Sequence, residues 1–510
     1  MPGSRTHNAL KNSIFTLICQ IVGLVVGFIG RTVLTNILGA EYLGINGLFA
    51  NVLSILSFAE LGIGSTLVYR LYKPVANEDR ARIAALIKLY KRIYEVIIVL
   101  IIFLGIVIIP FLKYIVDAPD VKENLILLYL LYLADTIITY AFVYKKAILT
   151  ADQKQYIISL FNQLFNIAAN VIQCIALALT HDFILYLLIK IICNLLNNIT
   201  CSLYAQKKYL YISPKETGAI DKAEIDGLKK DAKGLFLTKI ASTAFGSTDN
   251  IFISAFMGIG YVGILSNYTM IISIINSIIN SIFESITASI GNLNVTGDFE
   301  KTEQVLHRLY FINASFYSYV CIGMTLLIQD FVMHIWLSEE YYLSMFIVIT
   351  AFVELFFRSL HFPIYTTRNS LGLFSQYKVL FAVSALLNLA LDAVLIVPLG
   401  IAGLFIATII CRGITYIADI TAVYKYGFKK KPTQYYKNAA IWTAFTVVLG
   451  TVLYFIVGLI TVTGIAGFIM KFILITAAYF LVYFLAFRKN KCFRFFIDLS
   501  RTMMNRRKKV

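Results

Sequence analysis

The sequence contains an internal repeat, which indicates a fold built from two equivalent halves. Residues 38–45 read Leu-Gly-Ala-Glu-Tyr-Leu-Gly-Ile and residues 257–264 read Met-Gly-Ile-Gly-Tyr-Val-Gly-Ile, at an offset of 219. The correspondence continues downstream at offsets of 220 and 222, through the pairs Tyr90 and Tyr310, Asn166 and Asn388, Asn170 and Asp392, and Lys190 and Arg412. Many membrane transporters are built from two such halves.

The composition predicts a protein that crosses a membrane many times. Of the 510 residues, 59% are hydrophobic and 14% are charged, whereas soluble domains average about 45–50% apolar and about 25% charged residues. The net charge of +17 is interpreted as the excess of Lys and Arg that membrane proteins keep on the cytoplasmic side. Because the sequence has no long basic tract interleaved with aromatic residues, no nucleic-acid partner is expected.

A membrane-spanning helix needs about 20 apolar residues, and the sequence predicts fourteen such helices in an all-α fold. The first six are predicted at 10–38, 45–72, 83–110, 123–149, 156–180 and 184–206. The next six follow at 235–257, 263–292, 304–329, 341–367, 374–398 and 402–425. Two further helices, at 437–460 and 464–487, have no counterpart in the repeat.

The distribution of Lys and Arg predicts the orientation. One set of connections carries nearly all the basic residues, and the opposite set carries only Lys113 and Lys122. Both termini are therefore expected in the cytoplasm, which requires an even number of helices. Helices 1 and 7 then run in the same direction, so the repeat is parallel, with its axis along the membrane normal.

These patterns predict five parts along the chain. They are an N-terminal lobe of six helices at 1–206, a polar cytoplasmic linker at 207–234, a C-terminal lobe of six helices at 235–431, the appended helices at 432–487, and a basic cytoplasmic tail at 488–510. The tail is interpreted as a topology anchor, with an amphipathic surface helix attracted to anionic lipid as the alternative.

No motif indicates catalysis. The seven cysteines are not spaced as metal ligands, and we find no Walker motif and no nucleophile with a neighbouring base. We therefore expect no enzyme activity, no cofactor and no bound metal. Energy for transport would come from an ion gradient or a substrate gradient.

Polar residues follow one face of several predicted helices, at steps of three and four. The three stripes are Asn162, Asn166, Asn170 and Gln173; Lys190, Asn194, Asn197 and Asn198; and Ser273, Asn276, Ser277, Asn280, Ser281 and Glu284. Facing stripes predict a hydrated cavity between the halves. The alternative is that they form hydrogen bonds between helices, each worth about 0.6 kcal/mol.

Charged residues inside the predicted helices point to function, because each costs about 2.5–3.5 kcal/mol at the membrane centre. Four cations have no acidic residue three or four positions away: Arg31, Lys190, Arg412 and Lys471. They are candidates to bind an anionic substrate; pairing with Glu60, Asp135 or Asp249 is the alternative. Glu354 and Arg358 lie four residues apart and are expected to neutralise each other. The carboxylates Glu60, Asp135, Asp249 and Asp392 are candidates for binding a coupling ion.

The stretch from Arg31 to Gly44, followed by Phe58-Ala-Glu-Leu-Gly-Ile-Gly64, resembles the start of bacterial Wzx-type oligosaccharide flippases. These belong to the multidrug/oligosaccharidyl-lipid/polysaccharide (MOP) superfamily. The resemblance extends over the whole chain. It implies two parallel six-helix lobes in a V around a central cavity, working by alternating access in the bacterial cytoplasmic membrane. The implied substrate is an oligosaccharide repeat unit on undecaprenyl pyrophosphate, for a capsule, O-antigen or exopolysaccharide.

The resemblance also implies roles for residues and partners. Arg31, Lys190 and Arg412 would bind the pyrophosphate. The sugars would contact the polar stripes, including Asn166, Asn170, Asn276 and Asn280. Helices 13 and 14 would provide a groove for the lipid tail. Beside the resemblance, we expect a proton or sodium ion to couple transport at Glu60 or Asp135, with Asp249 and Asp392 as further candidates, and the polysaccharide polymerase machinery to be an associated partner.

Two other functions stay open at this point. The first is a cation-coupled multidrug exporter of the MATE type, whose members usually have twelve helices and more acidic cavities. The two extra helices and the membrane cations argue against it, whereas the four membrane carboxylates keep it open. The second is a membrane polymerase or glycosyltransferase, which would need a sizeable outer loop with catalytic groups. The predicted outer loops, of which 111–122 and 330–340 are the longest, are short.

Overall fold

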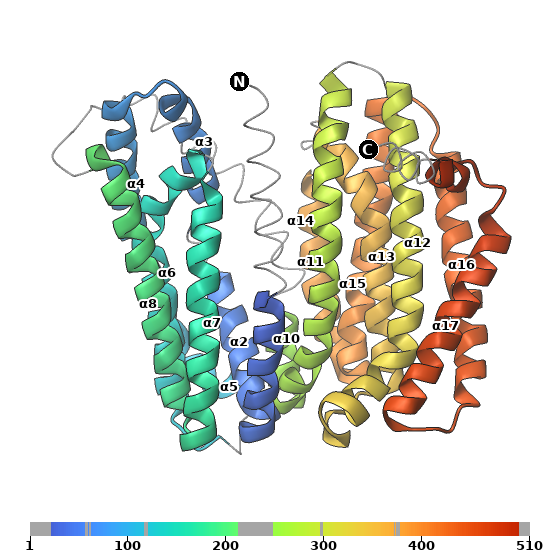
Figure 1. Cartoon of the computed structure of the whole chain (residues 1–510), viewed down its shortest axis with the longest axis horizontal. Helices are drawn as coiled ribbons and strands as arrows, with labels where there is room; N and C mark the ends of the chain where they lie inside the picture. Colours follow the sequence, from blue (N-terminus) through green and yellow to red (C-terminus); the bar gives the residue numbers. More distant parts are fainter. Residues whose placement is uncertain are drawn as a thin grey trace, which may run out of the picture. The chain divides into compact units, whose positions relative to one another are not determined.

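The computed structural model of the chain is helical throughout the part that it describes, with no strand there (Figure 1). The described residues are 22–56, 60, 63–116, 121–152, 154–212, 248–295, 299–371, 373 and 378–498; for 65, 76, 278–295 and 378 the description covers the backbone only. The all-α prediction is confirmed.

Within these residues, eleven helices are long and apolar enough to cross a membrane, by length and composition: Arg80–Ile115, Leu125–Ala151, Gln155–Thr180, Phe183–Lys208, Ile259–Ser277, Phe299–Trp336, Met345–Ser370, Val379–Leu399, Ile401–Phe428, Thr433–Gly458 and Gly464–Phe487. Two shorter apolar helices, Val22–Leu38 and Ala40–Leu56, precede them. The predicted helix at 235–257 is described only from residue 248. The count of fourteen helices therefore stays a prediction, and the protein is a multi-span membrane protein.

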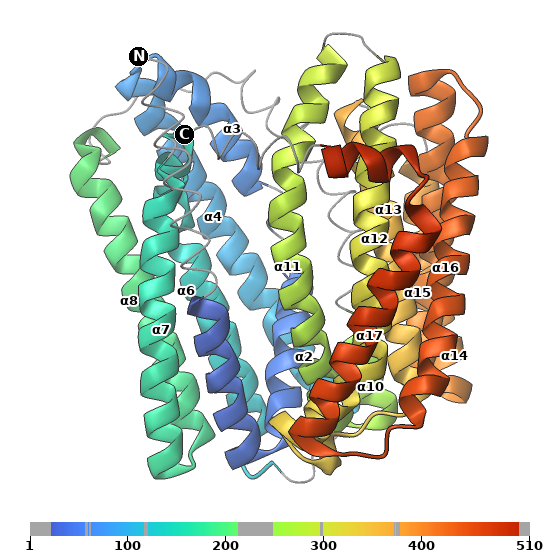
Figure 2. The same ribbon diagram turned by 45° about the vertical axis from the view of Figure 1, so that its right-hand side comes forward.

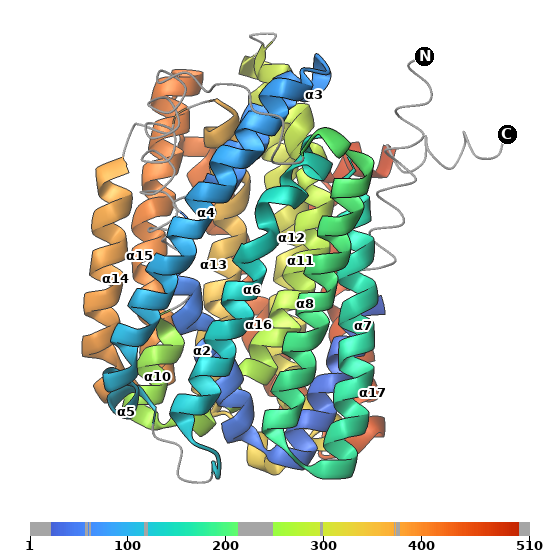
Figure 3. The same ribbon diagram turned by 90° about the vertical axis from the view of Figure 1, so that its left-hand side faces the viewer.

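The chain divides into two compact units, of which the first is Met1–Ser266. It holds the helix Val22–Leu38 and the following elements: α2 (Ala40–Leu56), α3 (Ile63–Ala76), α4 (Arg80–Ile108), α5 (Leu112–Ile115), α6 (Leu125–Ala151), α7 (Gln155–Thr180), α8 (Phe183–Lys208), α10 (Asp249–Met257) and the start of α11 (Ile259–Val295). Within it, α8 packs against α6 and α7, and α6 also packs against α3 and α4 (Figure 3).

The second unit is Asn267–Val510. Beyond the rest of α11 it holds α12 (Phe299–Phe331), α13 (Met345–Ser370), α14 (Lys378–Leu399), α15 (Ile401–Ala422), α16 (Thr433–Gly458) and α17 (Gly464–Phe487). Here α15 packs against α13 and α14, as α8 packs against α6 and α7 in the first unit. The division falls inside α11, whereas the predicted linker is at 207–234, so the predicted domain boundaries stay a prediction.

Polar caps explain where several helices begin. The side chain of Asn124 accepts hydrogen bonds from the backbone N–H groups of residues 126 and 127 at the start of α6. Asp182 does the same for α8. These side chains satisfy donors that a helix N-terminus otherwise leaves without partners.

The repeated motif forms two sharp breaks between helices. Gly39 separates the helix Val22–Leu38 from α2 with φ +90°, and Gly258 separates α10 from α11 with φ +96°. Residues with a Cβ atom rarely adopt this conformation, so both positions favour glycine. The sequence offset of 219 thus relates two breaks of the same kind.

The two copies of the motif also cross each other at close range inside the first unit. A Cβ atom on Gly44 of α2 would lie less than 3.0 Å from the backbone at Ile259, and one on Gly263 of α11 would lie less than 3.0 Å from the backbone at Ala40. Gly44 and Gly263 are themselves related by the offset of 219. The contact is therefore reciprocal. Because each glycine lacks a side chain, the first turn of the helix in the other copy can pack directly against it.

The two C-terminal helices pack on α12 (Figure 2). A buried cluster joins Ile322 and Leu327 of α12 to residues of α16 and α17, among them Leu453 and Tyr479. Lys471 of α17 forms an ion pair with Asp330 of α12, with Nζ and Oδ2 2.6 Å apart. This cation, a sequence candidate for substrate binding, therefore has an acidic partner that the prediction did not include.

We predict that Gly44→Ala and Gly263→Ala each lower the free energy of unfolding by about 1–3 kcal/mol, the usual cost of forcing extra atoms into a packed interior. The measurement is the melting temperature of the detergent-purified protein. Gly27→Ala is the matched control, since a Cβ there meets nothing within 4 Å and alanine is about 1 kcal/mol better than glycine inside a helix. Wild-type stability of both crossing variants would contradict the close approach.

Candidate functional site

Lys190 and Asp135 form an ion pair at membrane depth in the first unit. Lys190 Nζ on α8 lies 3.4 Å from Asp135 Oδ2 on α6, and it also lies over the ring of Tyr132, 5.0 Å from the centroid. Asn194 donates a 2.6 Å hydrogen bond to the other carboxylate oxygen. The Lys190 side chain is 40% exposed and that of Asp135 is 17% exposed. The distance between the two charged groups is thus long for an ion pair, and the Lys190 side chain is accessible to solvent.

The asparagine stripe of α8 is used largely for hydrogen bonds within the unit. Asn198 Nδ2 donates to Asn194 Oδ1 at 2.7 Å, and Asn197 Nδ2 donates across to Asn162 Oδ1 of α7 at 2.9 Å. The bond of Asn197 joins two helices, as the alternative interpretation expects, whereas the bond of Asn198 lies within α8.

Arg31 lies beside the glycine crossing. Its guanidinium donates a hydrogen bond to Ser266 Oγ, which in turn donates to the carbonyl oxygen of Gly263 at 2.7 Å. Arg31 is also within electrostatic reach of Tyr186 on α8. The basic residue that opens the sequence motif is therefore anchored at the same crossing.

Asn170 of α7 lies against the same N-terminal helix, and Asn166 is one turn before it on α7. A Cβ atom on Gly30, next to Arg31, would meet Asn170 Oδ1 at 2.5 Å, so glycine leaves room for this amide. Asn170 Nδ2 donates to Asn166 Oδ1 at 2.9 Å, and Asn166 is exposed. Asn170 is thus close to Gly30, which precedes Arg31, and Asn166 contacts Asn170; their role in substrate binding stays a prediction.

The second unit holds Arg412 in a three-residue ion cluster. Arg412 Nε of α15 lies 3.1 Å from Glu354 Oε1 of α13. Arg358 donates to both oxygens of the same carboxylate, at 3.1 and 2.5 Å. The Glu354 side chain is only 3% exposed, whereas that of Arg358 is 47% exposed. The predicted pairing of Glu354 with Arg358 is present, and Arg412 shares it.

The ion pairs link corresponding helices of the two halves. Lys190 and Arg412 are related by the offset of 222, whereas Asp135 and Glu354 are 219 residues apart, less than the 220 to 222 that relates the flanking matches. Each unit therefore links the fourth predicted helix of its half to the sixth by a carboxylate and a cation. Sequence reasoning missed the ion pair of Glu354 with Arg412, because it considered only Arg358, four residues away on the same helix.

The remaining amide candidates are in the second unit. Asn276 Oδ1 of α11 accepts a 2.8 Å hydrogen bond from the hydroxyl of Tyr317 on α12. Tyr317 is within electrostatic reach of Arg358, so Asn276 is near the ion cluster. The side chain of Asn280 lies outside the described residues, and its predicted role stays a prediction.

Asp392 of α14 is a buried carboxylate with incomplete hydrogen bonding. Its residue is fully buried, and Asn388 Nδ2 reaches Asp392 Oδ1 at 3.5 Å and Thr408 Oγ1 at 3.4 Å. The second oxygen, Oδ2, has no hydrogen-bond partner within the described part of the chain. Burying an ionised carboxylate costs a great deal unless a proton or a cation compensates it. Oxygen atoms of this kind are the ligands that hard cations prefer.

The other two candidate carboxylates have separate surroundings. Glu60 Oε1 accepts a 2.9 Å hydrogen bond from the hydroxyl of Tyr94 on α4, and Asp249 is in the first turn of α10. A further carboxylate, Asp419 of α15, is fully buried, with Oδ2 2.7 Å from His361 Nε2 and Oδ1 2.6 Å from Arg368 Nη1. The four candidate carboxylates therefore occupy different surroundings.

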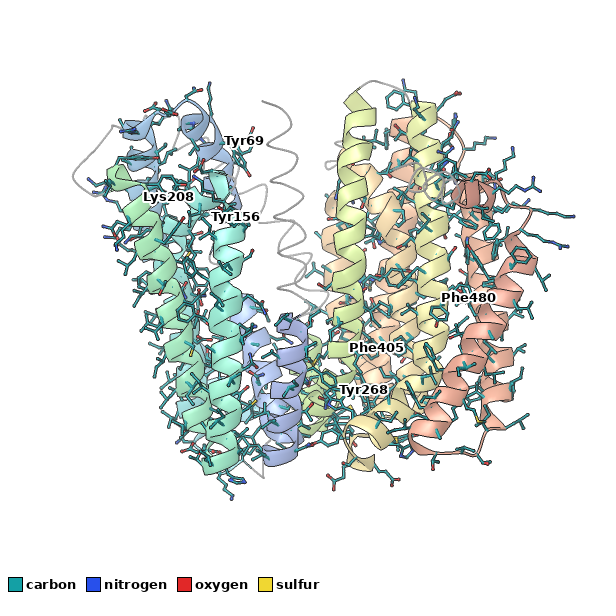
Figure 4. All side chains as sticks on the ribbon, in the orientation of Figure 1. Tyr69, Tyr156, Lys208, Tyr268, Phe405 and Phe480 are labelled. Carbon is teal, nitrogen blue, oxygen red and sulfur yellow. The ribbon has the colours of Figure 1, made fainter. Side chains whose placement is uncertain are left out.

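An apolar groove of about 360 Å³ runs between α12, α13 and α16. Its lining includes Ile322, Phe352, Phe356, Val447 and Tyr454. It shares Leu326, Tyr454 and Phe455 with a second hollow of about 460 Å³ that is also lined by Lys471. No described residue of α17 lines the first groove; on that helix Phe480 is 54% exposed (Figure 4).

We predict that Glu354→Gln destabilises the protein more than Asp135→Asn. Removing one partner of a buried ion pair costs about 3–5 kcal/mol, whereas an exposed pair contributes about 0–1 kcal/mol. Melting temperatures of the purified variants measure the difference. Glu95→Gln is the control, because its pair with Lys91 is at least half exposed on both sides. Equal losses at Glu354 and Asp135 would contradict the difference in burial.

Comparisons with known proteins agree with this architecture. A family described as polysaccharide biosynthesis protein matches residues 9–287, more than half of the chain. No curated protein matches. Among solved structures, the lipid II flippase MurJ in an inward closed conformation has a TM-score of 0.70 at 16% identity, over 93% of this chain and 99% of that one.

Two MATE transporters share the fold at lower similarity, and the first of them is a multidrug resistance transporter. An inward-facing MATE transporter of the MOP superfamily has a TM-score of 0.57 at 13% identity, over 80% of this chain and 96% of that one. A Vibrio cholerae MATE transporter has a TM-score of 0.55 at 12% identity, over 83% of this chain and 98% of that one. Because the family model matches more than half of the chain, the chain belongs to the polysaccharide biosynthesis protein family.

Proposed function

We propose that the protein is a flippase for undecaprenyl-pyrophosphate-linked oligosaccharide repeat units in the bacterial cytoplasmic membrane. Two parallel six-helix lobes would work by alternating access, with both termini in the cytoplasm. The observation that carries the proposal is the equivalent pair of membrane cations, Lys190 and Arg412, each held by a carboxylate. The family's description and the fold shared with a lipid II flippase support it.

The pyrophosphate would compete with the protein's own carboxylates for these cations. Lys190 is accessible and only 3.4 Å from Asp135, so a phosphate oxygen can replace Asp135 without a large movement. Charge-assisted hydrogen bonds to phosphate are among the strongest available to a side chain. In the second unit, Arg358 and Arg412 share the carboxylate of Glu354, and Arg358 is half exposed. Arg31 would add a third cation on the first unit.

The uncharged parts of the substrate would use the remaining features. Asn166 and Asn170 in the first unit and Asn276 and Asn280 in the second would donate and accept hydrogen bonds with sugar hydroxyls. The polyprenyl tail would enter the apolar groove between α12, α13 and α16, which assigns to α16 the role expected of both appended helices. The flipped unit must then be polymerised, so an association with polymerase machinery belongs to the proposal.

Ion coupling is assigned first to Asp392, because it is fully buried and one carboxylate oxygen has no hydrogen-bond partner in the described residues. A proton or a sodium ion bound there would balance the charge, with Asn388 and Thr408 as neighbouring ligands. Glu60, Asp135 and Asp249 stay candidates of lower rank. Because MATE transporters share the fold, a cation-coupled multidrug exporter is the second candidate function.

We expect the triple variant Arg31→Ala, Lys190→Ala, Arg412→Ala to lose polymer export when it replaces a flippase that a strain lacks. The reason is that three cations available to the pyrophosphate are removed. The matched control, Lys91→Ala, Lys113→Ala, Lys207→Ala, removes the same charge from exposed positions and should restore export. Membrane levels of both variants are compared by immunoblot. Full export by the first triple variant would refute the cation assignment.

The same strain separates the two candidate functions. A flippase restores polymer and leaves drug susceptibility unchanged, whereas a multidrug exporter changes susceptibility and does not restore polymer. For coupling, Asp392→Asn should abolish stimulation of transport by a proton or sodium gradient in vesicles. Its melting temperature should stay near that of the wild type, because the amide keeps the size of the side chain. Gradient-driven transport by this variant would exclude Asp392.

A further inference from the structure

The segment after α17 forms a short helix that lies across the end of that helix (Figure 2). Residues 491–498 are helical, and Asn490 caps the helix by accepting a 2.8 Å hydrogen bond from the backbone N–H of Cys492. This segment is the described start of what the sequence predicted as a basic tail. The structure therefore gives the start of the tail a definite shape.

Aromatic contacts hold this helix against α12 and α17. The guanidinium of Arg308 on α12 lies over the ring of Phe495, 3.7 Å from the centroid, a cation–π contact. Phe493 packs edge-on against Tyr483 and Phe484, with centroids 5.5 and 6.1 Å apart. These contacts fix one face of the helix to the protein.

Exposed basic residues lie in this helix and in the turn just before it. Arg488, Lys489, Lys491 and Arg494 are all exposed; we call these four residues the basic ledge. Asp498 is the one acidic residue between 488 and 498. Beyond it, the sequence from 499 to 510 adds five basic residues and no acidic one. A simple topology anchor needs the charges but not the docked helix.

Three further cations, Lys429, Lys430 and Lys431, lie near His307 of α12, which contacts the start of the helix 491–498. The backbone oxygen of His307 contacts Cys492 Sγ at 4.0 Å, and its ring contacts Asn438 of α16 at 3.3 Å. One turn away, Lys430 donates a 2.7 Å hydrogen bond to Glu303, which raises the pKa of the Lys430 ammonium. The exposed Lys429 and Lys431 flank it.

We propose that the basic ledge binds the headgroups of anionic phospholipids, with the helix 491–498 docked on the protein so that it holds these charges in place. Four exposed basic side chains on one short segment provide the electrostatic attraction that anionic lipid headgroups require. Each basic side chain near an anionic surface contributes about a five-fold factor to the binding equilibrium. This surface is separate from the proposed flippase site and does not depend on the identity of the substrate.

The test measures which lipids stay on the intact, full-length protein. The detergent-purified protein receives equal amounts of phosphatidylglycerol and phosphatidylcholine, and native mass spectrometry gives the ratio of bound lipids. We expect the wild type to prefer phosphatidylglycerol. The variant Lys489→Gln, Lys491→Gln, Arg494→Gln should lower that preference at least five-fold, and Phe495→Ala should lower it as well, because the charges remain but the helix loses its contact with Arg308.

The matched control is Lys73→Gln, Arg82→Gln, Lys207→Gln, which removes three exposed charges from the first unit and should keep the preference. Equal preference in the wild type and the ledge variant would overturn the proposal. Wild-type preference in Phe495→Ala would also overturn it, because charge without the docked helix would then suffice. Loss of polymer export by the ledge variant with unchanged lipid binding would assign the surface to a protein partner instead.

Discussion

The close crossing of the two repeated motifs is the constraint on which the first unit depends. Gly44 and Gly263 each admit the backbone of the other motif, where any side chain would collide. Gly39 and Gly258 break the preceding helices in a conformation that favours glycine. The close crossing of the two motifs thus requires glycine at four positions, two in each copy. Arg31 is held beside this crossing by its hydrogen bond to Ser266.

The repeat accounts equally for the charges at membrane depth. The pair of Lys190 and Asp135 and the pair of Arg412 and Glu354 link equivalent helices of the two halves. Their environments differ, because the first pair is long and accessible whereas Glu354 is buried and shared by two arginines. An accessible cation with a replaceable partner is suited to meet a phosphate. A buried carboxylate with two partners also stabilises the packing of α13 on α15.

Much of the candidate site could be predicted from residue types and spacing. The asparagine pair on α7 and the buried Asn388 and Asp392 on α14 follow from helical periodicity and the offset of 222. Which member of a pair is buried could not be predicted, since exposure depends on the neighbouring helices rather than on spacing. The same holds for Lys471, whose partner Asp330 is 141 residues away in the chain. It holds also for the helix 491–498, where docking requires Arg308 of another helix.

The sequence by itself determined an all-helical membrane protein with a two-fold internal repeat, because apolar length and periodicity are local properties that each segment carries alone. It also identified the charged residues in the predicted helices, for which a specific role is expected because inserting a charge into a membrane costs free energy. Only the tertiary structure decided which charges neutralise one another, which carboxylate is left incompletely bonded, and where the apolar groove opens. Those outcomes depend on distances between segments far apart in the chain, and packing sets these distances.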